Sequence, residues 1–224
     1  MFLRGGRSLE RAGGGVAAEA CTEIAAIHYY MSGRVFKQPT QQSSELTQKQ
    51  RDEIATFGRV STRHEDDYSN AQGFLVENWR IEDESAQGLR LVRGKAEAGK
   101  RHTHGQLLGV RPGEKGRFML GQVRWLMQAA NGDLHAGVRL LPGLPSPIAA
   151  RGTGLNVQTQ EYVPAIALSA VAALNAPPSL VIPPGWYKPK RVLEIHTGSA
   201  AKVRLTDVVE RGSDFERVLY EKAE

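Results

Sequence analysis

The chain has 224 residues, of which 41% are hydrophobic and 24% charged, values that are ordinary for a soluble globular protein of one large domain or two modest ones. Its 29 Lys and Arg residues against 24 Asp and Glu give a net charge of +5, which permits an anionic ligand without requiring one. The single cysteine, Cys21, excludes an internal disulfide framework, and no apolar run approaches the roughly 20 residues of a membrane-spanning helix. We therefore expect a cytoplasmic protein without a membrane partner.

The first third of the chain contains few clear elements. Residues 1–15 are basic and glycine-rich and are expected to form an irregular arm, a start that also fits the C-terminal part of a longer protein. Residues 16–31 balance helix and strand propensities, and their Tyr-Tyr end favours a strand. The polar stretch 32–72 is expected to be an insertion between two strands, with a short helix over residues 45–57.

Strand signals then become frequent, and they are linked by short turns. The expected strands cover residues 74–82, 88–93, 107–110, 118–128 and 134–141. Alternation in the fourth of these places Val123, Trp125 and Met127 on one face, and Asn131-Gly132-Asp133 is a strong hairpin turn. Short consecutive strands of this kind are typical of a small antiparallel barrel.

A second module follows a proline-rich boundary. Pro142, Pro145 and Pro147 are expected to break regular structure, which divides the chain into domains 1–148 and 149–224. The second domain is expected to be a smaller β-rich module with strands at 163–173, 178–182, 191–195, 202–209 and 216–220. No convincing sequence repeat relates the two halves.

The most informative motif is Asp83-Glu84-Ser85-Ala86-Gln87-Gly88, a D-x-S-x-x-G turn between two expected strands. The carboxylate accepts N–H bonds, the hydroxyl bonds local backbone, and the glycine tolerates positive φ or a close approach. By itself this pattern also describes an Asx-type hairpin turn without a ligand. Its weight comes from its order in the chain, ahead of Val123-Arg124-Trp125 and Gly137-Val138.

In this order the motifs resemble those of the PilZ family, the bacterial receptor domains for cyclic di-GMP, over roughly residues 4–141. The resemblance implies a mainly β fold, with an antiparallel six-stranded β-barrel carrying a helical or loop insertion and then the second, smaller β-rich module. PilZ domains also carry an RxxxR arm ahead of the first strand. Arg7 and Arg11 fit that position and are the favoured arm, while Arg59 and Arg63 form a second match closer to the turn.

The resemblance implies a non-catalytic cytoplasmic receptor whose ligand is cyclic di-GMP and which needs no cofactor. The implied ligand-binding residues are Arg7, Arg11, Asp83, Ser85 and Gly88. Arginine suits phosphate and guanine, and a carboxylate accepts from guanine N–H groups. The arm is expected to close over the bound ligand and so change how the barrel meets its neighbours, including a protein effector.

Two other function classes fit the sequence. One is a ligand-free PilZ-like module that docks a protein partner. The other is a nucleic-acid-binding β-barrel, suggested by the pI near 9.4 and by the basic-aromatic cluster at residues 186–191, although no dense basic tract supports it. We expect no metal site, because His102 and His104 lack a third ligand at suitable spacing and fit an exposed turn. We expect no enzyme, because no catalytic arrangement stands out.

Overall fold

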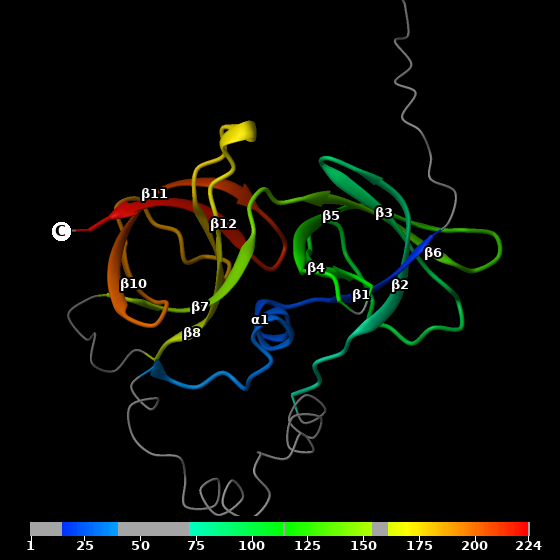
Figure 1. Ribbon diagram of the computed structural model, residues 1–224, viewed down its shortest axis with the longest axis horizontal. Helices are drawn as coiled ribbons and strands as arrows, with labels where there is room; N and C mark the ends of the chain where they lie inside the picture. The colour runs from blue at the N-terminus through cyan, green and yellow to red at the C-terminus, as the bar shows by residue number, and fades with distance from the viewer. Residues whose placement is uncertain (1–14, 40–71, 114, 154–160, 224) are drawn as a thin grey trace, which may run out of the picture.

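Two β-barrels lie side by side in the computed structural model, with the helix α1 (Ile24–Ser32) between them (Figure 1). The structure describes residues 15–39, 72–113, 115–153 and 161–223. The first barrel contains β1 (Val16–Cys21), β2 (Glu77–Ser85), β3 (Gly88–Arg93), β4 (Leu107–Pro112), β5 (Met119–Gln128) and β6 (Leu134–Leu140). The second contains β7 (Pro145–Gly152), β8 (Val163–Leu168), β9 (Ser179–Ile182), β10 (Val192–His196), β11 (Ala200–Arg211) and β12 (Glu216–Lys222).

The two barrels share one topology. The strand order is β1-β2-β3-β6-β5-β4 in the first barrel and β7-β8-β9-β12-β11-β10 in the second. Both are closed by antiparallel pairs, β1 with β4 and β7 with β10, so that neither sheet ends in an unpaired edge strand. The predicted mainly β fold, a barrel followed by a second β module, is confirmed. The second module is itself a closed barrel with the same number of strands, although no sequence repeat reveals the relationship.

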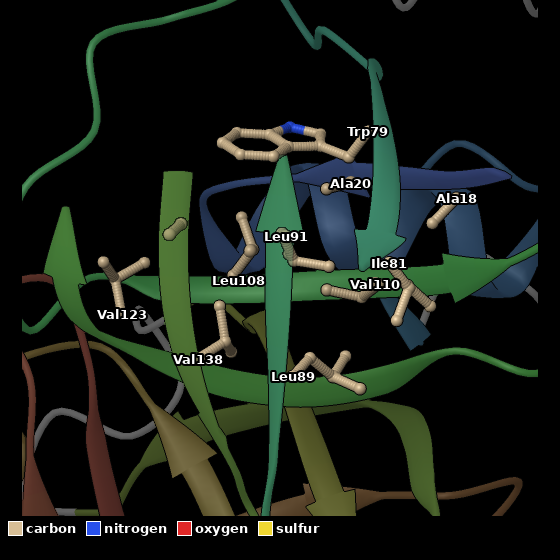
Figure 2. Close-up of a cluster of buried hydrophobic side chains, with 11 residues drawn as sticks. Ala18, Ala20, Trp79, Ile81, Leu89, Leu91, Leu108, Val110, Val123 and Val138 are labelled. Atoms are coloured by element: carbon tan, nitrogen blue, oxygen red, sulfur yellow. The ribbon is translucent and has the colours of Figure 1, made fainter. Parts of the chain in front are cut away.

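The first part of β2 alternates between the inside and the outside of the first barrel. In β2, Trp79 and Ile81 point inward and are buried, while Asn78 and Arg80 point outward and are exposed. Figure 2 shows the buried side chains converging from several strands, with Leu91 and Leu108 among those near the centre of the view. Each large apolar side chain buried in this way contributes about 1.5–3 kcal/mol to folding. A separate cluster around Leu180, Ile182 and Leu193 fills the second barrel.

The prediction of one strand over residues 16–31 is half wrong. The strand β1 ends at Cys21, and the helix α1 begins at Ile24. The helix buries Ala26 and Ile27 and contacts β7 and β8 of the second barrel. The helix and strand propensities of this segment are nearly equal, so its packing between the barrels decides that it is a helix. The helix ends at Ser32 and is capped by Gly33, whose positive φ of 63° lets its N–H donate to the Tyr29 carbonyl.

Pro142 lies between β6 and β7, as predicted for a proline that breaks regular structure, but Pro145 and Pro147 do not interrupt the chain. Pro145 and Pro147 lie within β7, which pairs with β8 over residues 145–150 but with β10 only over residues 149–152. The two prolines thus occupy the part of the strand with a neighbour on one side only, where a missing N–H is tolerated. The predicted domain boundary at about residue 148 falls inside this strand. The predicted helix over residues 45–57 lies outside the described residues, as does most of the predicted insertion.

The tip of the β11–β12 hairpin docks the second barrel onto the first. The Ser213 N–H donates to the Gly105 carbonyl at 3.0 Å, and the Leu107 N–H donates to the Asp214 carboxylate at 2.8 Å. A third apolar cluster forms at this junction and comprises Cys21, Ile27, Leu107, Leu120, Leu141, Ile166, Leu168, Val181 and Phe215. Both barrels and α1 contribute to it, so the two barrels share a continuous apolar contact.

Burial at this junction also determines the reactivity of the single cysteine. Cys21 is buried, as the sequence predicted, and burial raises the pKa of its thiol to about 12. A thiol with so high a pKa is inert at neutral pH. Within the described part of the chain, no helix has the length and apolar character needed to cross a membrane.

Candidate functional site

The D-x-S-x-x-G motif forms a tight hairpin at the end of the first barrel. The strand β2 continues through Ser85, which pairs with Gly88, so only Ala86 and Gln87 make the turn. The Ser85 hydroxyl donates to the Gly88 carbonyl at 3.2 Å. The Leu140 N–H donates to the Gln87 carbonyl at 2.9 Å and fixes the turn to the last residue of β6. Ser85 therefore holds the turn, as the sequence suggested.

Gly88 is required by a close approach between strands. A Cβ at this position would lie 2.8 Å from the Val138 carbonyl oxygen on β6. That contact is with backbone, so the neighbour cannot rotate away. The sequence allowed either positive φ or close approach for this glycine, and the structure selects close approach. Any side chain here would push the hairpin away from β6.

Two β-bulges shape the surface beside the hairpin. The pairing of β2 with β3 shifts between Ile81 and Asp83, and the pairing of β5 with β6 shifts between Val123 and Trp125. A bulge turns the following side chain to the other face of the sheet. Ile81 and Val123 accordingly stay in the core, whereas Asp83 and Trp125 point outward.

The predicted placement of Trp125 on the same face as Val123 is therefore wrong. Val123 is 1% exposed, whereas Trp125 is 44% exposed. The indole lies over Gly137, where an added Cβ would come within 1.9 Å of the indole nitrogen. Gly137 of the Gly137-Val138 pair is thus needed at this site, because only a residue without a side chain leaves space for the Trp125 ring.

These side chains line an open pocket of about 390 Å³ on the first barrel. Its lining comes from the hairpin and from the two strands beside it, namely Asp83, Glu84, Ser85, Gln87, Gly88, Leu89, Arg90, Arg124, Trp125, Gly137, Val138 and Arg139. Three guanidinium groups, two carboxylates and one aromatic plane meet within this space. The pocket can therefore recognise a ligand that carries negative charge, hydrogen-bond donors and a flat ring.

The three arginines of the pocket differ in how they are held. Arg90 pairs with Glu82 at 2.8 Å on the outer surface. Arg124 donates to the side-chain oxygen of the buried Gln122 at 2.9 Å. Arg139 forms an ion pair with Glu210 of the second barrel. Neither Asp83 nor Glu84, both of which line the pocket, makes a side-chain hydrogen bond or ion pair with the described residues.

Of the five predicted site residues, the structure brings Asp83, Ser85 and Gly88 together on the pocket rim. Arg7 and Arg11 lie outside the described residues, as do Arg59 and Arg63 of the second RxxxR match. Sequence reasoning missed four residues as contributors to the pocket, namely Arg90, Arg124, Trp125 and Arg139. Arg124 and Trp125 lie inside the V-x-W run, and Arg139 directly follows the Gly-Val pair, so proximity to the motifs was the available signal.

A buried hydrogen-bond network around Glu77 lies away from the pocket, at the start of β2, and stabilises the first barrel. The buried Glu77 carboxylate accepts from Trp79 Nε1 at 3.0 Å, Arg93 Nη1 at 2.6 Å, His102 Nε2 at 2.8 Å and the Lys100 N–H at 2.8 Å. The prediction of an exposed turn at His102 and His104 is therefore wrong for His102, which is 8% exposed and bonds Glu77, and right for His104, which is exposed in a turn. Among the described residues no group of three potential metal ligands occurs.

The fold defines a protein built from two β-barrels of the same topology. Residues 148–223, the greater part of the second barrel, match the family model described as FimW C-terminal beta-barrel domain. Neither a curated protein nor a solved structure matches the chain. The first barrel has no match among these comparisons, so its resemblance to the PilZ family stays a prediction.

Proposed function

We propose that the first barrel is a PilZ-like domain and that its pocket binds cyclic di-GMP, without catalysing a reaction. The observation that carries the proposal is the convergence of Asp83, three arginines and the exposed Trp125 around the D-x-S-x-x-G hairpin. Each group matches a part of a cyclic guanine dinucleotide. The proposed output is a change in how the protein meets an effector protein.

Guanine offers N1–H and N2–H donors on one edge, which a carboxylate accepts well. Asp83 supplies such an acceptor on the pocket rim. Adenine presents an acceptor at N1 in place of a donor, so the same carboxylate favours guanine. Arg124 and Arg139 supply charged donors for the phosphates, and the indole of Trp125 supplies a plane on which a base can stack.

The open shape of the pocket leaves one side of a bound ligand facing solvent. We propose that Arg7 and Arg11 cover this side after the ligand has bound, with Arg59 and Arg63 as the alternative pair. Two guanidinium groups there would add bonds to phosphate or to guanine O6 and N7.

Replacement of Asp83 by asparagine is expected to weaken cyclic di-GMP binding roughly 10- to 150-fold, because a hydrogen bond to a charged group contributes about 1.5–3 kcal/mol. Titration calorimetry of the full chain measures the effect. The matched control is Asp207→Asn, which changes an exposed carboxylate on β11 of the second barrel. Equal loss in both variants would argue against a specific role for Asp83. No heat from the unchanged protein at micromolar concentrations would favour a ligand-free interaction module instead.

Replacement of Trp125 by alanine is expected to weaken binding by about 5- to 150-fold, because stacking of a base on an aromatic side chain contributes about 1–3 kcal/mol. The control is Met127→Ala, which removes another exposed side chain from β5 without touching the pocket. The same calorimetric titration compares the two variants. A Trp125→Ala protein that binds as tightly as the Met127→Ala protein would show that the ring carries no base.

The nucleic-acid hypothesis has less support. Trp186 packs against the core of the second barrel, and the Arg191 guanidinium lies over its ring and donates to its carbonyl at 2.8 Å. The aromatic ring and the arginine are thus engaged with each other. Snorkelling basic side chains around a packed aromatic explain this cluster without a polynucleotide.

A further inference from the structure

The pocket of the first barrel is joined to the second barrel through two of its arginines. Arg139 pairs with Glu210, and Arg124 bonds Gln122, whose amide donates in turn to the Arg211 carbonyl at 3.3 Å. Glu210 and Arg211 are the last two residues of β11. Both links therefore reach the same hairpin, the one whose tip docks the second barrel onto the first.

Glu210 lies between two arginines, each of which can form an ion pair with its carboxylate. One carboxylate oxygen pairs with Arg139 of the first barrel. The other faces Arg217 Nη1 at 4.0 Å, and Arg217 is the cross-strand partner of Glu210 on β12. The Glu210 side chain is 6% exposed and the Arg217 side chain 10%, whereas that of Arg139 is 50% exposed. Arg139 is thus the partner with access to solvent and to the pocket.

Arg217 is positioned to accept Glu210 when Arg139 leaves. Its Nε donates to the Ser179 hydroxyl at 2.9 Å, which keeps the guanidinium in place. Burial lowers the pKa of Arg217, Glu210 opposes that effect, and the positive charge of Arg139 adds to it. Withdrawal of Arg139 would leave the buried carboxylate and the buried guanidinium to pair with each other alone.

We propose that a phosphate of the pocket ligand competes with Glu210 for Arg139, so that ligand binding weakens the attachment of the β11–β12 hairpin to the first barrel. The inference rests on the proposed function, because it assumes that the pocket takes cyclic di-GMP. It identifies Glu210 of the second barrel as the group that restrains the pocket arginine. As the ligand binds, the Glu210 carboxylate exchanges Arg139 for Arg217 as its ion-pair partner. The contact between the two barrels then depends on whether the pocket is occupied.

By reciprocity, loss of the restraint must tighten ligand binding. Replacement of Glu210 by glutamine is expected to strengthen cyclic di-GMP binding roughly 5-fold or more, the lower end of ordinary coupling between two sites. The matched control is Glu221→Gln, which removes the same charge from an exposed pair with Arg204 on the same two strands. Titration calorimetry of the full chain compares the two variants with the unchanged protein.

A second measurement needs no substitution and serves if the Glu210→Gln protein folds poorly. Amide hydrogen exchange of the unchanged protein reports the N–H groups of Ser213 and Leu107, which close the contact between the hairpin tip and the first barrel. Saturating cyclic di-GMP is expected to speed exchange at both amides, while the core amide of Leu180 in the second barrel keeps its rate.

The outcomes separate the two proposals. Tighter binding by Glu210→Gln and faster exchange at Ser213 and Leu107 support the competition. Ligand binding by the unchanged protein, with no gain in Glu210→Gln or with slower exchange at the two amides, overturns the competition and leaves the proposed function intact. No binding by any of the three proteins overturns the proposed function and the competition with it.

Discussion

Replacement of Glu77 by glutamine is expected to lower the free energy of unfolding by roughly 3 to 5 kcal/mol, the loss typical of removing one partner from a buried ion pair. The carboxylate is 2% exposed and accepts four hydrogen bonds, among them those from Arg93 and His102. Glutamine leaves the Arg93 charge without its counter-ion in the protein interior. Urea unfolding at pH 7 measures the change.

The same substitution is expected to alter the pH dependence of stability. Burial alone would raise the pKa of Glu77, but hydrogen bonds from His102, the Lys100 N–H and Arg93 outweigh it and lower the pKa from 4.5 to about 2. A carboxyl group with a lowered pKa in the folded state stabilises the protein above its unfolded-state pKa. That contribution is lost as the pH falls from about 4.5 toward about 2.

Unfolding curves at a series of acidic pH values test this expectation. The unchanged protein should lose stability across the interval, and Glu77→Gln should lose less. Glu97→Gln is the control, because Glu97 is an exposed acid on the loop between β3 and β4 and accepts only from Asn78 among the described residues. If Glu77→Gln destabilises no more than Glu97→Gln, the network does not hold the end of the first barrel.

Replacement of Phe215 by alanine is expected to destabilise the protein by about 3–5 kcal/mol, the range for removing a large aromatic side chain from a packed core. Phe215 is fully buried at the tip of the β11–β12 hairpin, in the cluster that joins the barrels. Because the lost contacts lie between the barrels, we expect the unchanged protein to unfold in one thermal transition and the Phe215→Ala protein to unfold in two. Differential scanning calorimetry measures both the shift and the number of transitions.

Val209→Ala provides the comparison, since Val209 lies on β11 of the same hairpin but is 46% exposed. Truncation of an exposed side chain of this kind usually changes stability by less than about 0.5 kcal/mol. A Phe215→Ala protein that loses several kcal/mol yet still unfolds in one transition would show that other contacts couple the barrels.

The sequence could predict most of the strands because their alternation is local information. The pattern in β2 and the turn at residues 131–133 each follow from the period of a strand or the chemistry of a turn. It could not predict α1, because the conformation of residues 24–32 depends on burial between two barrels that are distant in the sequence. The prolines of β7 misled for a related reason, since only the paired partners show which side of a strand lacks a neighbour.

The pocket was partly predictable. Asp83, Ser85 and Gly88 stood out because an acid, a hydroxyl and a glycine at fixed spacing suit a turn that also meets a ligand. Trp125 did not, because a single bulge moves it from the core face to the surface, and a bulge leaves no clear trace in the alternation. Arg139 and its partner Glu210 are 71 residues apart, so only the folded structure brings them together.

The most direct test of the account follows the indole N–H signal of Trp125 by nuclear magnetic resonance while cyclic di-GMP is added. The protein has three tryptophans, and the other two are held elsewhere, Trp79 by Glu77 in the first core and Trp186 against the second barrel. The signal that disappears in Trp125→Phe identifies the pocket residue. We predict that this signal alone shifts, saturably, with cyclic di-GMP and not with cyclic di-AMP. A Trp125 signal that stays fixed in excess cyclic di-GMP would contradict this prediction.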